Sequence, residues 1–491
     1  MLLIMPVSFY TSRVVLAELG VDDYGIYNVV GGVVMFFSFL KGCMSATTQR
    51  FLTFDMGEGD CKKLNHTFST ALNIHIGIAI IIILLGETVG LWFINNTLNI
   101  PATRMYAANW VYQFSIITFC INIIQVPYNA ALIAHEKMDI YAYISIIEVL
   151  MKLGIAYILT IISSDKLIIY GLLLLIIQII LNGIYQLYCR VQYPECRFRI
   201  TKNPAQYKQI AGFASWNLAG NLTWIIKDQG SNIILNIFFG PAINAARALA
   251  IQVSGVVIGF ASNFQVALNP QITKQYALKD IETMKTLVMQ GVKYSFILIF
   301  FLTFPLLLNI DYVLNLWLTK VPQYTSYFII LVMVEILIST LFGTPYTTAI
   351  TATGKNKYYE ITLGIINLLT FAVAYILLRS GYAAVSVFYV SIAFTFISGL
   401  ARILIARHQI GFALNQIAKE VLAPIGYMLL LAVPIPLFLR LYYFPDINFG
   451  SFILLCAITT LFVLLATWKV VLKKNEKESL LQVVKNKLRR S

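Results

Sequence analysis

The stretch VPYNAALIAHEKMDIYAYISIIEVLMKLGIAYIL, residues 126–159, occurs a second time in the chain in an altered form. Residues 344–377, TPYTTAITATGKNKYYEITLGIINLLTFAVAYIL, align with it without a gap and match it at twelve of 34 positions. Each copy runs out of one apolar segment, through a short basic turn and into the next apolar segment. This pattern indicates that the chain contains an internal duplication of a helical unit.

A looser match extends the duplication. The stretch RFLTFDMGEGD at 50–60 has a counterpart, QITKQYALKD, at 271–280. The spacing indicates a unit of six helices. Because six is even, both halves enter the membrane from the same side, and parallel repeats of this kind are typical of transporters whose substrate path lies between the halves. A scaffold whose duplication reflects ancestry alone is the alternative.

The composition requires a membrane. Of 491 residues, 59% are hydrophobic and 12% are charged, and the mean hydropathy is +0.78. Apolar runs of about 20 residues, the length that spans a bilayer as a helix, recur along the whole chain. The alternation of an outer-membrane barrel is absent. We place the spans at 1–18, 25–47, 68–94, 108–132, 140–163, 167–189, 212–238, 243–268, 288–311, 325–351, 358–378, 381–405, 420–440 and 449–471.

The basic residues predict the orientation. When charged residues near the edges of these spans are assigned to the adjoining loops, 27 of the 36 Lys and Arg residues belong to the even-numbered loops and the tail, seven belong to the odd-numbered loops, and Lys152 and Lys227 lie within spans. Cytoplasmic loops carry the excess of positive charge, so both termini are expected in the cytoplasm. The net charge of +14 is explained in this way, and no nucleic-acid partner is expected. The basic loops and the tail 469–490 should attract anionic lipids.

Two further features of the sequence concern metal binding and the start of the first helix. The six cysteines form no CxxC and no cluster with histidine, so no metal site is expected. Arg13 follows the first apolar run after only twelve residues, which suggests that the chain begins late within its first helix.

Three segments carry a family resemblance: SRVVLAELGVDDYGIYNVVGGVV at 12–34, ATTQRFLTFDMGEGD at 46–60 and VALNPQITKQYALKD at 266–280. With them the sequence resembles the Wzx-like polysaccharide flippases, which export O-antigen and capsule units and belong to the superfamily of the MATE drug exporters and the lipid II flippases. The resemblance implies an all-α integral membrane fold of about fourteen transmembrane helices. It places a MATE-like N-terminal lobe at 1–205, a second six-helix lobe at 206–410, and two added helices with a basic tail at 411–491.

The resemblance also implies a function. A flippase of this family moves an undecaprenyl-diphosphate-linked oligosaccharide from the cytoplasmic to the periplasmic leaflet of the bacterial inner membrane, for lipopolysaccharide or capsule synthesis. Its partners would be the lipid-linked oligosaccharide and other membrane proteins of polysaccharide assembly. It would be a transporter rather than an enzyme, without a resident cofactor, and Na⁺ or H⁺ could drive it.

The predicted span 212–238 has the clearest polar face. Four polar residues fall within about 60° on a helical wheel, with Lys227 to one side. A polar stripe on a membrane helix should face protein or water. We interpret it as cavity lining that binds the diphosphate, with hydrogen bonding between helices as the alternative. The four residues are Asn217, Asn221, Asp228 and Asn232.

Two arginines and one charge pair complete the candidates. Arg247 and Arg13 lie near the outer ends of the two halves, in what we take to be related positions, where they could bind diphosphate or snorkel to headgroups. Glu148 and Lys152 are four residues apart and should form an ion pair. The acids within the spans that could take up Na⁺ or H⁺ are Asp311, Asp228 and Glu148, of which the last two are the candidates for ion coupling.

Two other functions stay open. One is a cation-coupled drug exporter of the same fold, which would need an acidic cavity. The other is a membrane glycan polymerase or ligase, although no outside loop is long and neither GxSxG nor HExxH occurs.

Overall fold

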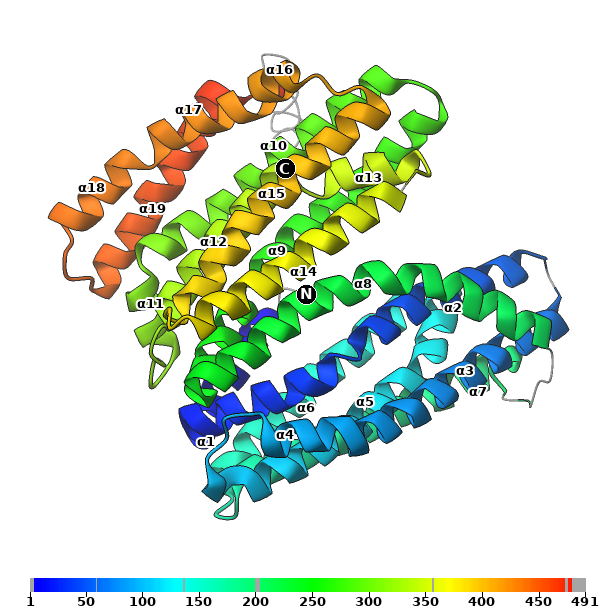
Figure 1. Ribbon diagram of the computed structural model, residues 1–491. Helices are drawn as coiled ribbons and strands as arrows, with labels where there is room; N and C mark the ends of the chain where they lie inside the picture. The colour runs from blue at the N-terminus through cyan, green and yellow to red at the C-terminus, as the bar shows by residue number, and fades with distance from the viewer. Residues whose placement is uncertain are drawn as a thin grey trace, which may run out of the picture. The chain divides into compact units, whose positions relative to one another are not determined.

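The computed structural model describes residues 4–58, 60–135, 137–197, 199, 204–355, 357–472 and 476–478, and within these the chain is α-helical and contains no β-strand. In the bilayer core a helix satisfies its own backbone hydrogen bonds, which explains why the apolar runs are all helical. The helices are α1 (Ile4–Met35), α2 (Ser38–Glu58), α3 (Cys61–Leu85), α4 (Leu91–Asn96), α5 (Met105–Ala134), α6 (Met138–Ile161), α7 (Lys166–Gln192), α8 (Pro204–Phe239), α9 (Pro241–Ala277), α10 (Ile281–Leu308), α11 (Ile310–Trp317), α12 (Thr325–Leu341), α13 (Thr344–Ala352), α14 (Lys357–Arg379), α15 (Val385–Ile410), α16 (Leu414–Ile417), α17 (Ala423–Ala432), α18 (Pro434–Tyr442) and α19 (Phe449–Ala466) (Figure 1).

The helices are long and apolar enough to identify a multi-pass membrane protein. Eleven segments of the described chain could cross a bilayer, or twelve if the bent pair 6–35 and 40–49 counts as one span. Several segments are built from more than one helix, such as Thr325–Ala352, which joins α12 and α13. The count agrees roughly with the predicted fourteen spans. α8 is not among the segments, and it is the helix on which the sequence analysis found the polar stripe.

The first two predicted spans meet at a glycine. α1 is interrupted at Gly20, whose φ of 79° lies in the left-handed region that favours glycine. α2 continues beyond the predicted second span, 25–47, to Glu58. Lys41 and Arg50, predicted in a cytoplasmic loop, therefore lie within a helix.

A second glycine occupies the same place in the second half. Gly240 separates α8 from α9 with a φ of 80°. Gly20 and Gly240 are 220 residues apart, which is the offset of the looser sequence repeat. The predicted duplication is thus visible as two identical turns between the first two helices of each half.

Helix starts repeat at the same offset. Asp60 caps α3 by accepting hydrogen bonds from the backbone amides of Lys62 and Lys63, at 2.9 and 3.1 Å. Asp280 caps α10 by accepting one from the amide of Thr283 at 3.1 Å. Both aspartates satisfy amides that a helix start would leave without partners.

The tighter sequence repeat also has a structural counterpart. Tyr128 in α5 and Tyr346 in α13 occupy matching positions and are both fully buried. Tyr128 packs edge-on against Phe68 with ring centroids 5.2 Å apart, and Tyr346 packs similarly against Phe412 at 5.5 Å. The repeated tyrosine is therefore a core residue in each copy.

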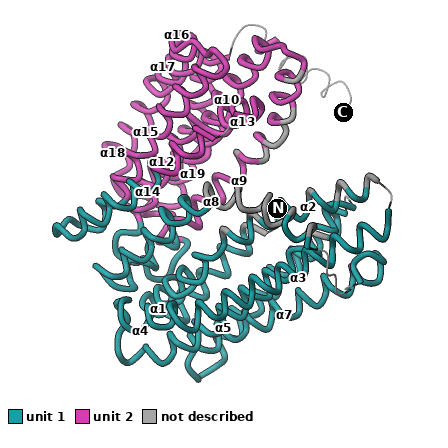
Figure 2. Tube along the Cα trace, turned by 45° about the vertical axis from the view of Figure 1, so that its right-hand side comes forward, with its two compact units in different colours: residues 1–249, 317–325, 367–387 teal, residues 250–316, 326–366, 388–491 magenta. Residues whose placement is uncertain are grey.

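The chain forms two compact units, coloured in Figure 2. Unit 1 comprises residues 1–249, 317–325 and 367–387, and unit 2 comprises 250–316, 326–366 and 388–491. These units do not coincide with the predicted lobes 1–205 and 206–410, since unit 1 includes α8 and residues 317–325 and 367–387 of the second half. The lobes themselves stay a prediction.

In unit 1, α5 is the central helix. It packs against α7, α2, α3 and α1. Arg104, which precedes the first residue of α5, forms two ion pairs. It donates to Asp23 of α1 at 2.5 Å and to Asp165, the cap of α7, at 2.7 Å. The arginine thereby joins three segments of unit 1 at one end.

In unit 2, α10 packs against α13 and α19. Phe296, Phe300 and Phe304 stack along its buried face. Lys293, only 3% exposed, donates to the carbonyl oxygen of Val471 at 3.3 Å and lies 3.5 Å from the Glu476 carboxylate. Because Val471 ends the last span, this lysine compensates the negative end of that helix.

The capping aspartates lead to a pH prediction. Hydrogen bonds from the backbone amides of Lys63 and Lys62 lower the pKa of Asp60 below its ordinary 3.8, and hydrogen bonds from Thr283 do the same for Asp280. A lowered folded-state pKa means that the cap is intact above 3.8 and is lost as the pH falls through the lowered value. Hydrogen exchange of the first turns of α3 and α10, corrected for intrinsic rates, should therefore accelerate in acid and, at neutral pH, in Asp60→Ala and Asp280→Ala. Asparagine variants cap without titrating, so equal acid sensitivity in Asp60→Asn and the parent would contradict this origin.

Candidate functional site

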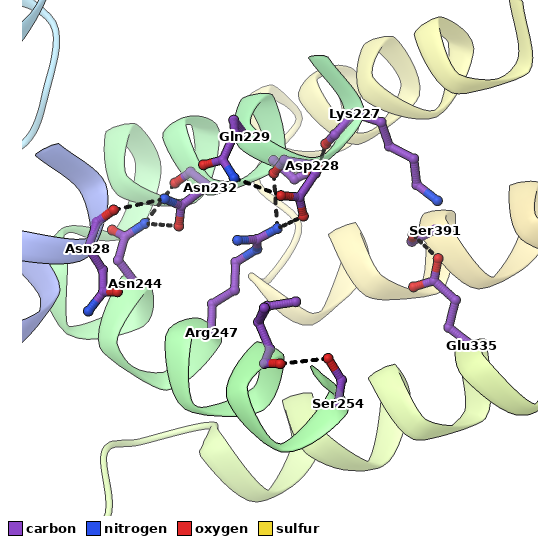
Figure 3. Close-up of polar contacts among 12 residues, drawn as sticks. Asn28, Lys227, Asp228, Gln229, Asn232, Asn244, Arg247, Ser254, Glu335 and Ser391 are labelled. Carbon is purple, nitrogen blue, oxygen red and sulfur yellow. Dashed lines mark hydrogen bonds and ion pairs between the residues drawn. The ribbon is translucent and has the colours of Figure 1, made fainter. Parts of the chain in front are cut away.

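A buried ion pair joins α8 and α9. Nη2 of Arg247 donates to Oδ1 of Asp228 at 2.6 Å and to the Asp228 carbonyl oxygen at 2.9 Å. The arginine side chain is 10% exposed and the aspartate side chain 27%. In Figure 3 the arginine rises from α9 towards Asp228 on α8. Since both bonds use Nη2 and a guanidinium has five N–H donors, Arg247 can bind a second acceptor while it holds Asp228.

Two neighbours of Asp228 extend this polar region. Gln229 donates from Nε2 to Oδ2 of Asp228 at 2.7 Å. Lys227 precedes Asp228 and extends away from the ion pair in Figure 3. Two cations therefore lie near Asp228: Arg247 of α9, which is paired with it, and Lys227 of α8, which precedes it.

An asparagine network lies one turn further along α8. Asn244 donates to the carbonyl oxygen and to Oδ1 of Asn232, at 2.7 and 2.8 Å, and accepts a hydrogen bond from Asn236 at 3.1 Å. Asn232 in turn donates to the carbonyl oxygen of Asn28 in α1 at 3.3 Å. Asn232, Asn236 and Asn244 are buried, so the network binds α9 and α1 to α8 rather than facing open water.

The predicted stripe on α8 is therefore divided. Asp228 and Asn232 contact other helices, as the alternative interpretation of the stripe expects. The side chains of Asn217 and Asn221 lie outside the described part of the structure, although their backbone belongs to α8. Their assignment to a cavity stays a prediction.

The two predicted arginines do not occupy equivalent positions. Counted from the matching turns, Gly20 and Gly240, Arg13 lies seven residues before its glycine and Arg247 seven residues after. The counterpart of Arg247 in the first half is Tyr27. The structure shows Arg13 half-buried in α1, and each arginine must be judged by itself.

The predicted pair of Glu148 and Lys152 is present. Lys152 Nζ lies 2.6 Å from Glu148 Oε1 within α6. Sequence reasoning missed a third charge beside it, because Lys41 was assigned to a loop. Lys41 in α2 donates to Oδ1 of Asn122 in α5 at 3.3 Å, and Glu148 acts on it electrostatically. Unit 1 thus contains two cations and one acid in this region.

The statement that Asp311, Asp228 and Glu148 are the acids of the spans is wrong. Glu335 lies within α12, where its Oε1 accepts hydrogen bonds from Ser391 at 2.7 Å and Thr395 at 2.8 Å, both in α15. Figure 3 draws the contact with Ser391. Its presence within an apolar run, LVMVEILIS, was a sufficient signal.

The charged and amide side chains of these groups can bind an anionic or hydroxylated ligand. Within the described residues no three His, Cys, Asp or Glu side chains come together as a metal site. Arg247, Lys227 and Lys41 are cations on helices of a multi-pass membrane protein, where they can compensate a negative charge. Amide side chains beside them can hydrogen-bond hydroxyl groups or phosphate.

Comparisons with solved structures identify the architecture. The inward-facing form of a multidrug resistance MATE family transporter of the MOP superfamily superposes with a TM-score of 0.67, covering 84% of this chain and 96% of its own. The chain has the MATE-like fold. The outward-facing form of a transporter of this family gives a TM-score of 0.56.

A flippase shares this fold over a greater length. The lipid II flippase MurJ, in an inward closed conformation, covers 95% of this chain and 98% of its own with a TM-score of 0.61. The identities, 14% to the MATE transporter and 12% to MurJ, establish the fold and no more. No family model and no curated protein matches the sequence.

The Arg247–Asp228 pair can be tested by stability. Arg247→Ala should lower the free energy of unfolding by about 3 kcal/mol, because it leaves a largely buried carboxylate without its partner. Asp228→Ala should have a similar effect. The double variant should lose less than the sum of the two, which a thermal unfolding cycle in detergent would measure. Strict additivity would show that the two side chains do not interact in the folded protein.

Proposed function

We propose that this protein is a flippase that moves an undecaprenyl-diphosphate-linked oligosaccharide from the cytoplasmic to the periplasmic leaflet of the bacterial inner membrane by alternating access. The observation that carries the proposal is the likeness to MurJ over nearly the full length of both chains. The MATE transporter covers 84% of this chain and MurJ covers 95%, and the greater coverage supports a flippase.

The charges of unit 1 suit an anionic cargo. A diphosphate must lose much of its hydration on entering an apolar layer, and charge-assisted hydrogen bonds compensate that loss. Arg247 has donors beyond those that hold Asp228, and Lys227 extends from the same helix turn. Arg13, Asn217 and Asn221 complete the proposed binding residues, and Lys41 joins them, whereas Asn232, which the sequence also predicted to bind cargo, is occupied by its contacts with Asn28 and Asn244.

A cation-coupled drug exporter is the second candidate. The higher TM-score of the MATE transporter, 0.67 against 0.61, favours it. A cationic drug requires an acidic site, whereas Asp228 is already compensated by Arg247 and Glu148 by Lys152. The flippase therefore accounts better for the side chains.

Ion coupling is part of the proposal. Asp228 and Glu148 were the sequence candidates, and both accept a hydrogen bond from a cation. Glu335, which accepts from two hydroxyl groups within the apolar α12, is a further candidate to take up H⁺ or Na⁺. Glu335→Gln should abolish the dependence of transport on a pH or Na⁺ gradient without lowering the amount of protein in the membrane; unchanged dependence would remove this residue from coupling.

In the cell, the protein would act with both termini in the cytoplasm, beside other membrane proteins of polysaccharide assembly. Its basic loops and tail would contact anionic lipids.

A transport assay tests the diphosphate assignment. In proteoliposomes with a fluorescent undecaprenyl-diphosphate oligosaccharide, Lys227→Ala and Arg247→Ala should each slow flipping by about tenfold, since one charge-assisted hydrogen bond contributes about 1.5 kcal/mol. Arg247→Lys, which keeps the charge, should be less affected.

Lys274→Ala is the matched control, because Lys274 is an exposed cation on the same helix as Arg247. The amount of folded protein is measured for each variant. Flipping at the parental rate in Lys227→Ala and Arg247→Ala would exclude these cations from the path. Efflux of ethidium in a pump-deficient strain, without flipping of the lipid, would instead establish the drug exporter.

A further inference from the structure

One end of unit 1 contains a close contact between the two sequence repeats. Gly25, Asn28 and Gly32 follow the Gly20 turn in α1 and lie on one face of the helix, at spacings of three and four residues. All three meet second-repeat residues of α8 or the start of α9. We call this contact the outer seam, because the turns at Gly20 and Gly240 belong to the side predicted to face outwards.

The seam has no room for an added carbon at two of these positions. A Cβ on Gly25 would overlap the backbone carbonyl group of Pro241, which begins α9. A Cβ on Gly32 would lie 2.6 Å from Nδ2 of Asn232 and 3.0 Å from Oε1 of Gln229. At Gly25 the approach of α1 to α9 therefore requires glycine, and at Gly32 an added methyl group would displace the side-chain ends of Asn232 and Gln229. Gly31 differs, since a Cβ there would meet nothing within 4 Å.

A second contact extends the seam across unit 1. Trp317, at the end of α11, donates from Nε1 to the carbonyl oxygen of Phe9 at 2.8 Å. The two rings meet edge-on with centroids 4.9 Å apart. Phe9 belongs to the first repeat and Trp317 to the second, so the repeats meet at a second, separate place in unit 1.

We propose that the outer seam is the gate that closes the transport path on the periplasmic side. The inference rests on the proposed function, because in a parallel-repeat carrier the halves must separate at one end to release cargo there. The residues that hold the repeats together at that end are then the ones that must come apart.

The composition of the seam suits a contact that opens. Two glycines bury no side chain of their own, so separation there exposes little apolar surface. The polar contact, from Asn232 to the carbonyl oxygen of Asn28, is a single 3.3 Å hydrogen bond that water can replace. Gly20 and Gly240, with φ near 80°, stand directly beside the seam, where a turn can absorb a change of angle.

A labelling experiment in the full-length chain tests the gate. The reporter is Ala245→Cys, in a background whose six native cysteines are replaced by serine or alanine. Ala245 is the repeat counterpart of Gly25, follows Pro241 by four residues and is fully buried. A membrane-impermeant maleimide is added to right-side-out vesicles of the parent and of Gly25→Ala, Gly32→Ala and Gly31→Ala.

We expect the reporter to be labelled several-fold faster in Gly25→Ala and Gly32→Ala, because the added methyl group holds the seam apart. Gly31→Ala makes the same chemical change on the same helix and should behave as the parent. Equal labelling of Gly25→Ala and Gly31→Ala, with both present in the membrane, would overturn the proposal. So would faster labelling only in inverted vesicles.

A reversible cross-link covers the case in which the glycine variants do not fold. A short thiol cross-linker between Phe9→Cys and Trp317→Cys should stop transport and slow labelling of Ala245→Cys, and reduction should restore both. Full transport with the cross-link in place would contradict a gate. The labelling experiment does not require cargo, so it tests the gate separately from the flipping of lipid. If the seam opens but the protein flips no lipid, the proposed function is refuted and the proposed gate is retained.

Discussion

In hydrocarbon, a backbone amide or a charged side chain without a partner costs several kcal/mol, and this constraint determines most of the structure. The backbone obeys it by forming helices. The side chains obey it by pairing: Arg247 with Asp228, Lys152 with Glu148, and Lys41 with Asn122. The three buried asparagines next to the Gly240 turn follow the same rule. Each of these polar side chains of the described spans lies against a second polar group.

The elements of the fold could be predicted from the sequence because they depend on local properties. Apolar length predicts a spanning helix, and the repeat predicts that the chain is built twice. The turns at Gly20 and Gly240 show this duplication in the backbone. The end of α2 was missed because this helix continues past its apolar run to Glu58, so that charges such as Arg50 do not mark its end. The breaks within long helices, such as that between α12 and α13, were missed for the opposite reason, since apolar sequence continues across them.

The candidate site was harder to predict from the sequence, because the role of each side chain depends on contacts with residues far away in the chain. A helical wheel placed Asp228 and Asn232 on one face of α8, but it could not show that Arg247 and Asn244 already bind them. Glu148 and Lys152 were paired correctly because four residues separate them. Lys41 reaches the same region from another helix, and no spacing in the sequence connects it to Asn122. The site therefore combines a predicted set of residue types with partners that only the fold reveals.

The buried lysine of α10 has a consequence for how long such a chain must be. Lys293 has its ammonium group against the last carbonyl oxygens of the final span and beside Glu476. A shorter relative that ended after the twelfth span would strand that positive charge in an apolar wall. A relative that has lost the last two helices should therefore have a neutral residue in place of this lysine. A lysine at this position indicates that the C-terminal helices pack against α10 as part of the fold.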